Sequence, residues 1–199
     1  MRTIGKGLRA ALFSFAVACA LGAGPAGAQY VNPAAPQPPE DQLKPGLAVS
    51  YYFHFFRHIR ELVEWEDYKE GKPGEPITSL DSRAGPGDVL TSGVSDGVGA
   101  KITGFIKLDT PGAYSFAFES NDGVRLEIDG YQVVQDPDVH GDRFSDIGAV
   151  IVKEPGWYPI TIRYFERKNT STLKFHWLPP GAEGTMPVVP AEALAHIPQ

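Results

Sequence analysis

Cysteine is nearly absent from this sequence, since Cys19 is the only one among 199 residues. It lies in an N-terminal segment that we expect to be removed during export. The mature chain then has no disulfide and no thiol nucleophile. Its fold must be stabilised by buried apolar side chains, and a composition of 42% hydrophobic and 11% aromatic residues is typical of a globular protein with a sizeable core.

The sequence also lacks an excess of positive charge and, beyond residue 21, any long apolar run. The formal net charge is −6, which argues against nucleic acid or an anionic membrane surface as the partner. We expect no membrane span, because no second apolar stretch has the length that a transmembrane helix needs. A neutral glycan or a component of the cell envelope is compatible with this charge.

Residues 1–28 have the pattern of a secretory signal peptide. Three basic residues precede the apolar run 10–21, and Ala26-Gly27-Ala28 supplies the small residues of a cleavage site. We expect a mature N-terminus at Gln29 and a soluble product that is secreted or periplasmic. Lipidation at Cys19 is the alternative.

The remaining chain reads as a linker followed by one domain. Five prolines predict that residues 29–45 form an extended linker without packed structure, ahead of a domain over residues 46–195. One short amphipathic helix is expected near the N-terminus of the domain, from about His54 to Tyr68, and a Gly- and Pro-rich loop follows over 71–88.

Alternating apolar residues predict that nearly all of the rest is β-strand. The expected strands are 47–53, 102–108, 112–118, 124–128, 131–134, 150–152, 158–164 and, last, 173–177. Short strands that recur between glycines and prolines are typical of an all-β protein. We therefore predict an antiparallel β-sandwich.

The stretch from Gly112 to Tyr131 is central to this arrangement. Its two apolar alternations are separated by Ser120-Asn121-Asp122-Gly123, so Asn121 and Asp122 lie on a connection between two strands that face one core. Carboxylate and amide oxygens at such a loop tip are the ligands that Ca²⁺ prefers. The alternative is a simple turn, because Asn-Asp-Gly is common turn chemistry and Asp often bonds nearby backbone amides.

The same residues resemble the central signature of the protective-antigen (PA-fourteen) domain family. The matching segments are 89–93, 104–106, 112–116, 120–130, 156–160 and 173–180, and the resemblance covers residues 46 to 195. It implies a β-sandwich fold of the kind found in bacterial toxins, glycosidases and yeast adhesins. Several members bind glycans through a calcium ion held by two consecutive aspartates.

In this sequence the first residue of that aspartate pair is Asn121. The resemblance implies a calcium site formed by Asn121 and Asp122, completed by Asn169 from the loop between the last two strands, with Asn121, Asp122 and Gly123 contacting the glycan. An amide oxygen ligates calcium but contributes no charge. We therefore expect weaker calcium binding than at a site with two aspartates.

Four other local patterns have simpler explanations. Gly93-Val94-Ser95-Asp96-Gly97 fits a nucleophile elbow in form but is followed by a strand pattern, so we expect a turn. Asp136 to Gly141 is expected to be an acidic surface loop, or alternatively a loop that borders the Asn121-Asp122 site. His54 and His58 have the spacing of a zinc pair without a third ligand. The sequon that begins at Asn169 is expected to form a turn.

Two classes of function remain open. The first is a secreted, non-enzymatic, calcium-dependent carbohydrate-binding module. The second is a structural or protein-interaction module of the cell envelope without a metal site. An enzyme ranks third, because no acid/base pair, nucleophile constellation or metal triad stands out.

Overall fold

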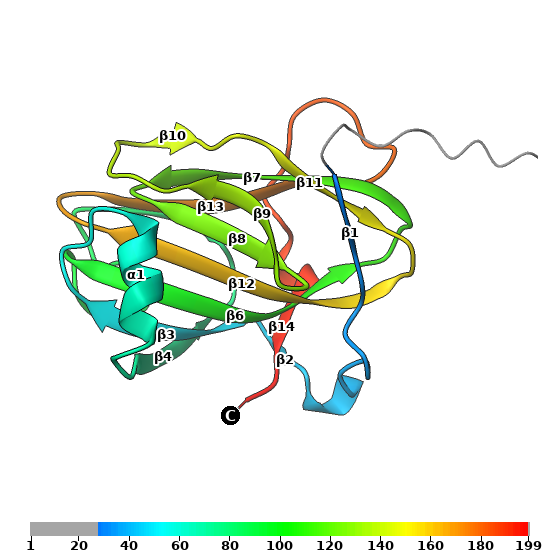
Figure 1. Ribbon diagram of the computed structural model, residues 1–199, viewed down its shortest axis with the longest axis horizontal. Helices are drawn as coiled ribbons and strands as arrows, with labels where there is room; N and C mark the ends of the chain where they lie inside the picture. Colours follow the sequence, from blue (N-terminus) through cyan, green and yellow to red (C-terminus); the bar gives the residue numbers. More distant parts are fainter. Residues whose placement is uncertain (1–27, 199) are drawn as a thin grey trace, which may run out of the picture.

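Two sheets packed face to face form the frame of residues 28–198, the part of the chain that the computed structural model describes (Figure 1). The six-stranded sheet contains β1 (Gln29–Val31), β5 (Asp81–Gly85), β7 (Gly112–Asn121), β10 (Arg143–Phe144), β11 (Gly148–Val152) and β13 (Ser171–Leu178). The eight-stranded sheet contains β2 (Lys44–Pro45), β3 (Leu47–Phe53), β4 (Lys72–Ile77), β6 (Val98–Leu108), β8 (Val124–Ile128), β9 (Tyr131–Asp136), β12 (Gly156–Glu166) and β14 (Leu194–His196). The predicted all-β sandwich is confirmed.

Strand pairing follows the antiparallel expectation with one exception. The path through the six-stranded sheet is β1-β11-β7-β13-β5, and β1 pairs with β11 in parallel. The central path of the other sheet is β2-β14-β6-β12-β8-β9, and β6 and β12 pair along eleven residues from Leu108 opposite Gly156 to Val98 opposite Glu166.

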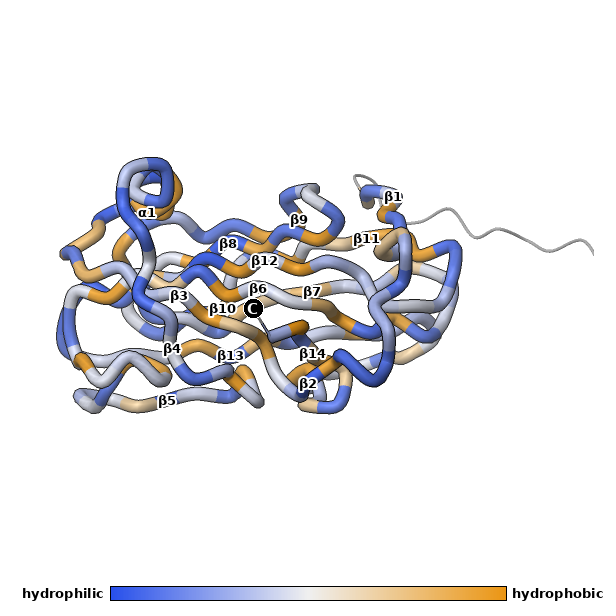
Figure 2. The backbone as a smooth tube through the Cα atoms, turned by 90° about the horizontal axis from the view of Figure 1, so that it is seen from below, coloured by the Kyte–Doolittle hydropathy of each residue, from blue (hydrophilic) through white to orange (hydrophobic). Residues whose placement is uncertain are grey.

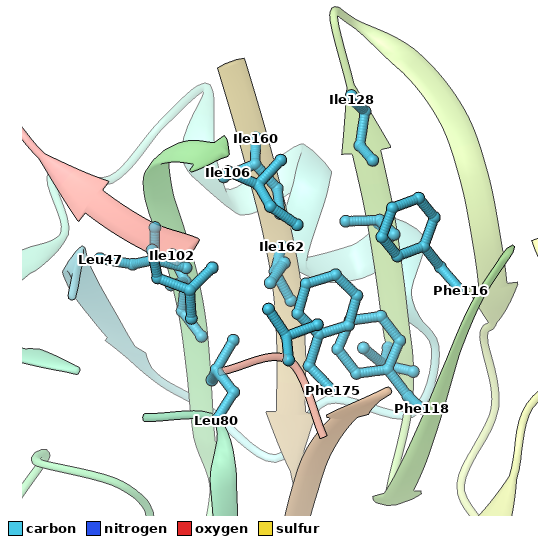
Figure 3. Close-up of a cluster of buried hydrophobic side chains, with 14 of the residues drawn as sticks. Leu47, Leu80, Ile102, Ile106, Phe116, Phe118, Ile128, Ile160, Ile162 and Phe175 are labelled. Atoms are coloured by element: carbon cyan, nitrogen blue, oxygen red, sulfur yellow. The ribbon is translucent and has the colours of Figure 1, made fainter. Parts of the chain in front are cut away.

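The core lies between the two sheets, where the inward residues of both meet (Figure 3). Phe118 and Phe175 stack with ring centroids 4.7 Å apart, and Phe116 stacks on Phe175 at 5.6 Å. Figure 2 shows hydrophobic and hydrophilic stretches alternating along the strands of both sheets. The alternation read from the sequence therefore identifies the correct inward face, with Trp177 only partly buried at its margin.

The connection from β7 to β8 carries the chain from one sheet to the other. β7 pairs with β11 and β13, whereas β8 pairs with β12 and β9, so the two strands are not hydrogen-bonded neighbours. Asn121 ends β7, and Asp122 and Gly123 cross to the opposite sheet. The loop tip is consequently tied to both sheets. The β8–β9 hairpin turns at Asp129 and Gly130, both with positive φ, as the sequence predicts.

The helix is shorter than predicted and is not N-terminal in the fold. Helix α1 (Ile59–Glu66) follows β3 and begins at His58, whose side chain accepts a hydrogen bond from the backbone N–H of Arg60. Phe56, Ile59 and Leu62 pack with Tyr52 and Phe165 into a second apolar cluster. This cluster holds α1 on the outer face of the eight-stranded sheet (Figure 1).

Three loop or linker predictions differ from the structure. The stretch 71–88 contains β4 and β5, and each lies at the edge of its sheet. Prolines are tolerated in β4 because an edge strand does not need every backbone N–H for pairing. The segment 29–45 is packed on the domain, since it includes β1, the 3-10 helix η1 (Glu40–Gln42) and β2. After β13, a further 3-10 helix, η2 (Ala191–Ala193), leads into the unpredicted strand β14.

Some expectations concern residues that the structure does not describe. Residues 1–27 of the predicted signal peptide, with Cys19 among them, lie outside the described range. Within the described range, no helix combines the length and apolar character needed to cross a bilayer.

Candidate functional site

A pocket of about 310 Å³ opens at the end of the sandwich where β7 crosses to β8. Three segments enclose it: Asn121-Asp122 from the crossing, residues 139–141 from the loop after β9, and residues 167–170 from the β12–β13 turn. In Figure 1 these connections lie at the left end of the molecule, the same end as helix α1. The third segment contains Asn169, which the family resemblance implies as a calcium ligand.

Asp122 lies in the wall of this pocket and is only 3% exposed. Its Oδ1 accepts a hydrogen bond from the backbone N–H of His140 (2.9 Å), and its Oδ2 accepts one from the backbone N–H of Arg167 (2.8 Å). Burial raises the pKa of this carboxyl, and the two backbone hydrogen bonds oppose that rise. One carboxylate therefore ties together the two loops that face it.

The amide of Asn121 has a defined orientation. Its Nδ2 donates to Asp142 Oδ1 (3.2 Å) and to Thr170 Oγ1 (2.9 Å), while its backbone oxygen accepts from the Tyr164 hydroxyl at 2.5 Å. Because both amide hydrogens are directed to acceptors, Oδ1 is left without a donor among the described residues. The peptide bond that joins Asn121 to Asp122 is cis.

Asn169 also lines this pocket. It occupies the β12–β13 turn with φ of 81°, and its backbone N–H donates to Asp96 Oδ1 at 2.7 Å. Its side chain is exposed. The structure thus brings Asn121, Asp122 and Asn169 together around one space.

Gly123 occupies a different environment from these three residues. A Cβ at this position would come within 2.4 Å of the Phe165 ring and 2.9 Å of the Pro137 carbonyl oxygen. Glycine is needed here because the chain crosses between sheets against these groups. Gly123 consequently serves close packing behind the pocket wall.

Several residues at this end were not identified from the sequence. Thr170 and Asp142 orient Asn121, Tyr164 bonds its backbone, and Glu166 lies buried just behind. A signal for Glu166 exists in the sequence, because the alternation Tyr158, Ile160, Ile162, Tyr164 continues to it on the inward face. A charged residue at a core-facing position is an informative exception.

The other motifs resolve as local structure. The loop 136–141 borders the site, and its Asp136 is bonded by Arg143 through Nε at 2.9 Å and Nη2 at 2.5 Å. His58 caps α1, whereas His54 stacks on Trp65 at 4.4 Å, so the two rings do not form a zinc pair. The segment 93–97 is a turn that leads into β6.

The donor set around the pocket fits a hard cation better than zinc. No group of three or more His, Cys, Asp or Glu side chains with metal-binding geometry occurs within residues 28–198. The pocket instead offers the carboxylate of Asp122, the amide oxygen of Asn121 and the side chain of Asn169. Such a mixture of carboxylate and amide oxygens is characteristic of calcium ligands, with waters or backbone carbonyls to complete the shell.

The chain matches a known domain family and resembles solved structures. Residues 43–189 match the family model of the PA14 domain. The PA14 domain of the antifreeze protein MpAFP has a TM-score of 0.66 at 18% identity, over 80% of this chain and 95% of that one. No match is found among curated protein sequences.

Two further similar structures are described as sugar-binding. The A domain of epithelial adhesin 9 from Candida glabrata, in complex with Galβ1-4GlcNAc, has a TM-score of 0.64 at 12% identity, over 85% of this chain and 96% of that one. The PA14 sugar-binding domain of an RTX adhesin has a TM-score of 0.58 at 17% identity, over 76% and 98%. At these identities the likeness shows the fold alone.

Proposed function

Because the chain belongs to the PA14 domain family, we propose that it is a non-enzymatic carbohydrate-binding module that holds calcium at the Asn121-Asp122 pocket. The observation that carries this proposal is the convergence of Asn121, Asp122 and Asn169 from separate segments on one pocket. Local turn chemistry at Asn-Asp-Gly explains a bend in the chain. It does not explain why Asn169, 48 positions after Asn121 in the sequence, faces the same space.

The orientation of Asn121 supports the metal-binding role. Its amide hydrogens are bound by Asp142 and Thr170, which leaves Oδ1 as a lone-pair donor fixed in one position. Each oxygen of Asp122 accepts one backbone N–H and retains further lone pairs. A bound calcium ion accepts such oxygens and keeps open coordination positions for additional ones.

Vicinal hydroxyls of a sugar are suited to those open positions. The similar adhesin and sugar-binding domains support a glycan as the ligand class. Two residues that line the pocket add apolar or aromatic surface: Val139 is itself exposed, and the Nζ of Lys168 lies 5.4 Å from the centroid of the half-exposed Phe55 ring. An exposed aromatic ring beside polar groups is a common platform for the apolar face of a sugar.

A module of this kind acts outside the cytoplasm. The signal-peptide pattern of residues 1–28 supports a secreted or periplasmic location. Mass spectrometry of the exported protein tests this, and the expected mature N-terminus is Gln29. A lipid-modified Cys19 at the N-terminus would contradict it.

Calorimetric titration with calcium tests the site itself. We expect the parent to bind calcium and Asp122→Ala to lose binding, because this change removes the one carboxylate in the pocket wall. Asp41→Ala is the matched control, since it removes an exposed aspartate in η1. A glycan array read with and without a chelator then tests the sugar, and calcium-independent binding would contradict the proposed mode.

One observation favours the second candidate, a structural or protein-interaction module of the cell envelope without a metal. Both oxygens of Asp122 already accept backbone N–H groups, so this residue fixes two loops even without an ion. Under that alternative the parent binds no calcium at millimolar concentrations. Asp122→Ala would then change only the stability of the protein and the order of the two loops.

A further inference from the structure

Glu166 is a carboxylate in an unusual position within this fold. It is the last residue of β12, on the inward face that also holds Ile162 and Tyr164, and it is 0% exposed. Both of its side-chain oxygens are buried without a hydrogen-bond partner among the described residues. The backbone N–H of Gly97 donates to Arg167 O at 3.1 Å, and it also lies close enough to the Glu166 carboxyl to lower the pKa of that group.

Backbone contacts place Glu166 directly behind the pocket. The N–H of Asp122 donates to Phe165 O at 3.3 Å, and Asp122 Oδ2 accepts from the N–H of Arg167 at 2.8 Å. Asp122 is therefore bonded to the residues on both sides of Glu166. Tyr164, two positions earlier on the same face, reaches Asn121 through its hydroxyl.

An isolated buried carboxylate is unfavourable unless an opposite charge or hydrogen bonds compensate it. Burial, together with the charges of Asp96 and Asp122, raises the pKa of Glu166 to about 7, and the backbone N–H of Gly97 opposes that rise. Two other buried carboxylates in the protein have cationic partners: Glu66 contacts Arg163 and Lys101, and Asp136 contacts Arg143. Neither oxygen of Glu166 has an arginine or lysine partner among the described residues.

We propose that Glu166 supplies the second negative charge of the cation site, from behind the pocket wall, and so compensates for the neutral Asn121. This inference rests on the proposed calcium site. Glu166 acts on the ion through space rather than by lining the pocket, because Coulomb attraction is strong where water is excluded. The ion in turn stabilises the charged form of the carboxylate.

Calcium titration of charge-removing variants tests this inference. Glu166→Gln and Glu166→Met should each weaken calcium binding by about tenfold or more, because the anionic charge near the site falls. Glu154→Gln is the matched control, since it removes the same charge from an exposed position in the β11–β12 connection. Its calcium affinity should equal that of the parent.

Urea unfolding without calcium gives the second measurement. Both Glu166 variants should be more stable than the parent, because an uncompensated buried carboxylate has been removed. Loss of calcium affinity together with a gain of calcium-free stability is the signature of a charge reserved for an ion. A residue that only supports packing would lose both, and that result overturns the inference.

The remaining outcomes separate the two proposals. If the parent binds calcium and the Glu166 variants bind it equally well, the role of Glu166 is wrong and the calcium site stands. If the parent binds no calcium at millimolar concentrations, the calcium site is wrong and the role of Glu166 is wrong with it.

Discussion

The buried carboxylates of Glu66 on α1 and Glu166 on β12 differ in whether the chain supplies an opposite charge. On the outer face of the eight-stranded sheet, Glu66 of α1 accepts from Arg163 through Nε (2.7 Å) and Nη2 (3.0 Å) and lies 2.8 Å from Lys101 Nζ. Arg163 also donates to Glu127 at 2.7 Å. On the inner face, three residues further along the same strand, Glu166 has no such partner within residues 28–198.

The difference follows from what each group does. Glu66 fixes the end of α1 on the sheet, and its charge is balanced within the chain by Arg163 and Lys101. Glu166 lies behind a pocket whose wall contains Asp122, and its charge is not balanced by the chain. A buried carboxylate without an opposite charge takes up a proton more readily, and in our proposal the cation supplies the missing opposite charge.

Removing Arg163 from its ion pairs with Glu66 and Glu127 should have the largest effect on stability. Arg163→Met leaves Glu66 and Glu127 without their shared partner, and we expect a loss of about 3 kcal/mol in the free energy of unfolding. Urea denaturation measures this. The double variant Glu66→Gln/Arg163→Met removes charges of both signs and should recover part of the loss. If the single variant is as stable as the parent, the ion-pair cluster does not hold the helix.

The stability of the protein should depend on pH through Glu166, whose charge has no partner among the described residues. The pKa of Glu166 is about 7 in the folded protein against an ordinary value of 4.5, because burial disfavours its charged form. The folded state then holds a proton that the unfolded chain has released, so stability falls as pH rises from about 4.5 to about 7. The raised pKa of Asp122 acts in the same direction at lower pH.

Glu166→Gln removes this titration. Measured without calcium, its advantage over the parent in the free energy of unfolding should grow across that window, to on the order of 2 kcal/mol at about pH 8. Urea denaturation at about pH 5 and about pH 8 gives the comparison, with Glu154→Gln as the control. Equal pH dependence in parent and Glu166→Gln would show that Glu166 is not the titrating group.

Replacing Asn121 by aspartate tests the effect of adding a negative charge at the proposed calcium site. Asn121→Asp replaces the Nδ2 that donates to Asp142 with an oxygen, so without calcium it should lower the free energy of unfolding by about 1 kcal/mol. With two carboxylates at the ion, calcium affinity should rise by about tenfold. Calorimetry and urea denaturation measure the two effects. Unchanged affinity would contradict the placement of the ion at residue 121.

The smallest effect is expected at a charge pair that neither region uses. Arg60 and Glu64 on α1 lie 3.6 Å apart with side chains 73% and 59% exposed. Arg60→Ala should change the free energy of unfolding by less than about 0.5 kcal/mol, because water screens such a pair. A larger loss would indicate that surface charge on α1 contributes to the cluster around Arg163.

The amino-acid sequence by itself determines the strands and their inward faces. Tyr114, Phe116 and Phe118, like Ile160 and Ile162, alternate with polar or small residues because a strand that is buried on one face repeats every two positions. The same local logic identifies the Asp129-Gly130 turn. It fails for β4 and β5, where pairing at a sheet edge overrides the Gly- and Pro-rich composition.

Only the tertiary structure decides how the site is assembled. The sequence and its family resemblance name Asn121, Asp122 and Asn169. The patterns noted at residues 136–141 and at the sequon do not identify Asp142 and Thr170 as the partners that orient Asn121. Glu166 continues the alternation of inward-facing residues along β12, and its role depends on which charged groups lie near it. Those neighbours are set by how two sheets meet at one end of the sandwich, which is a long-range property that no local spacing encodes.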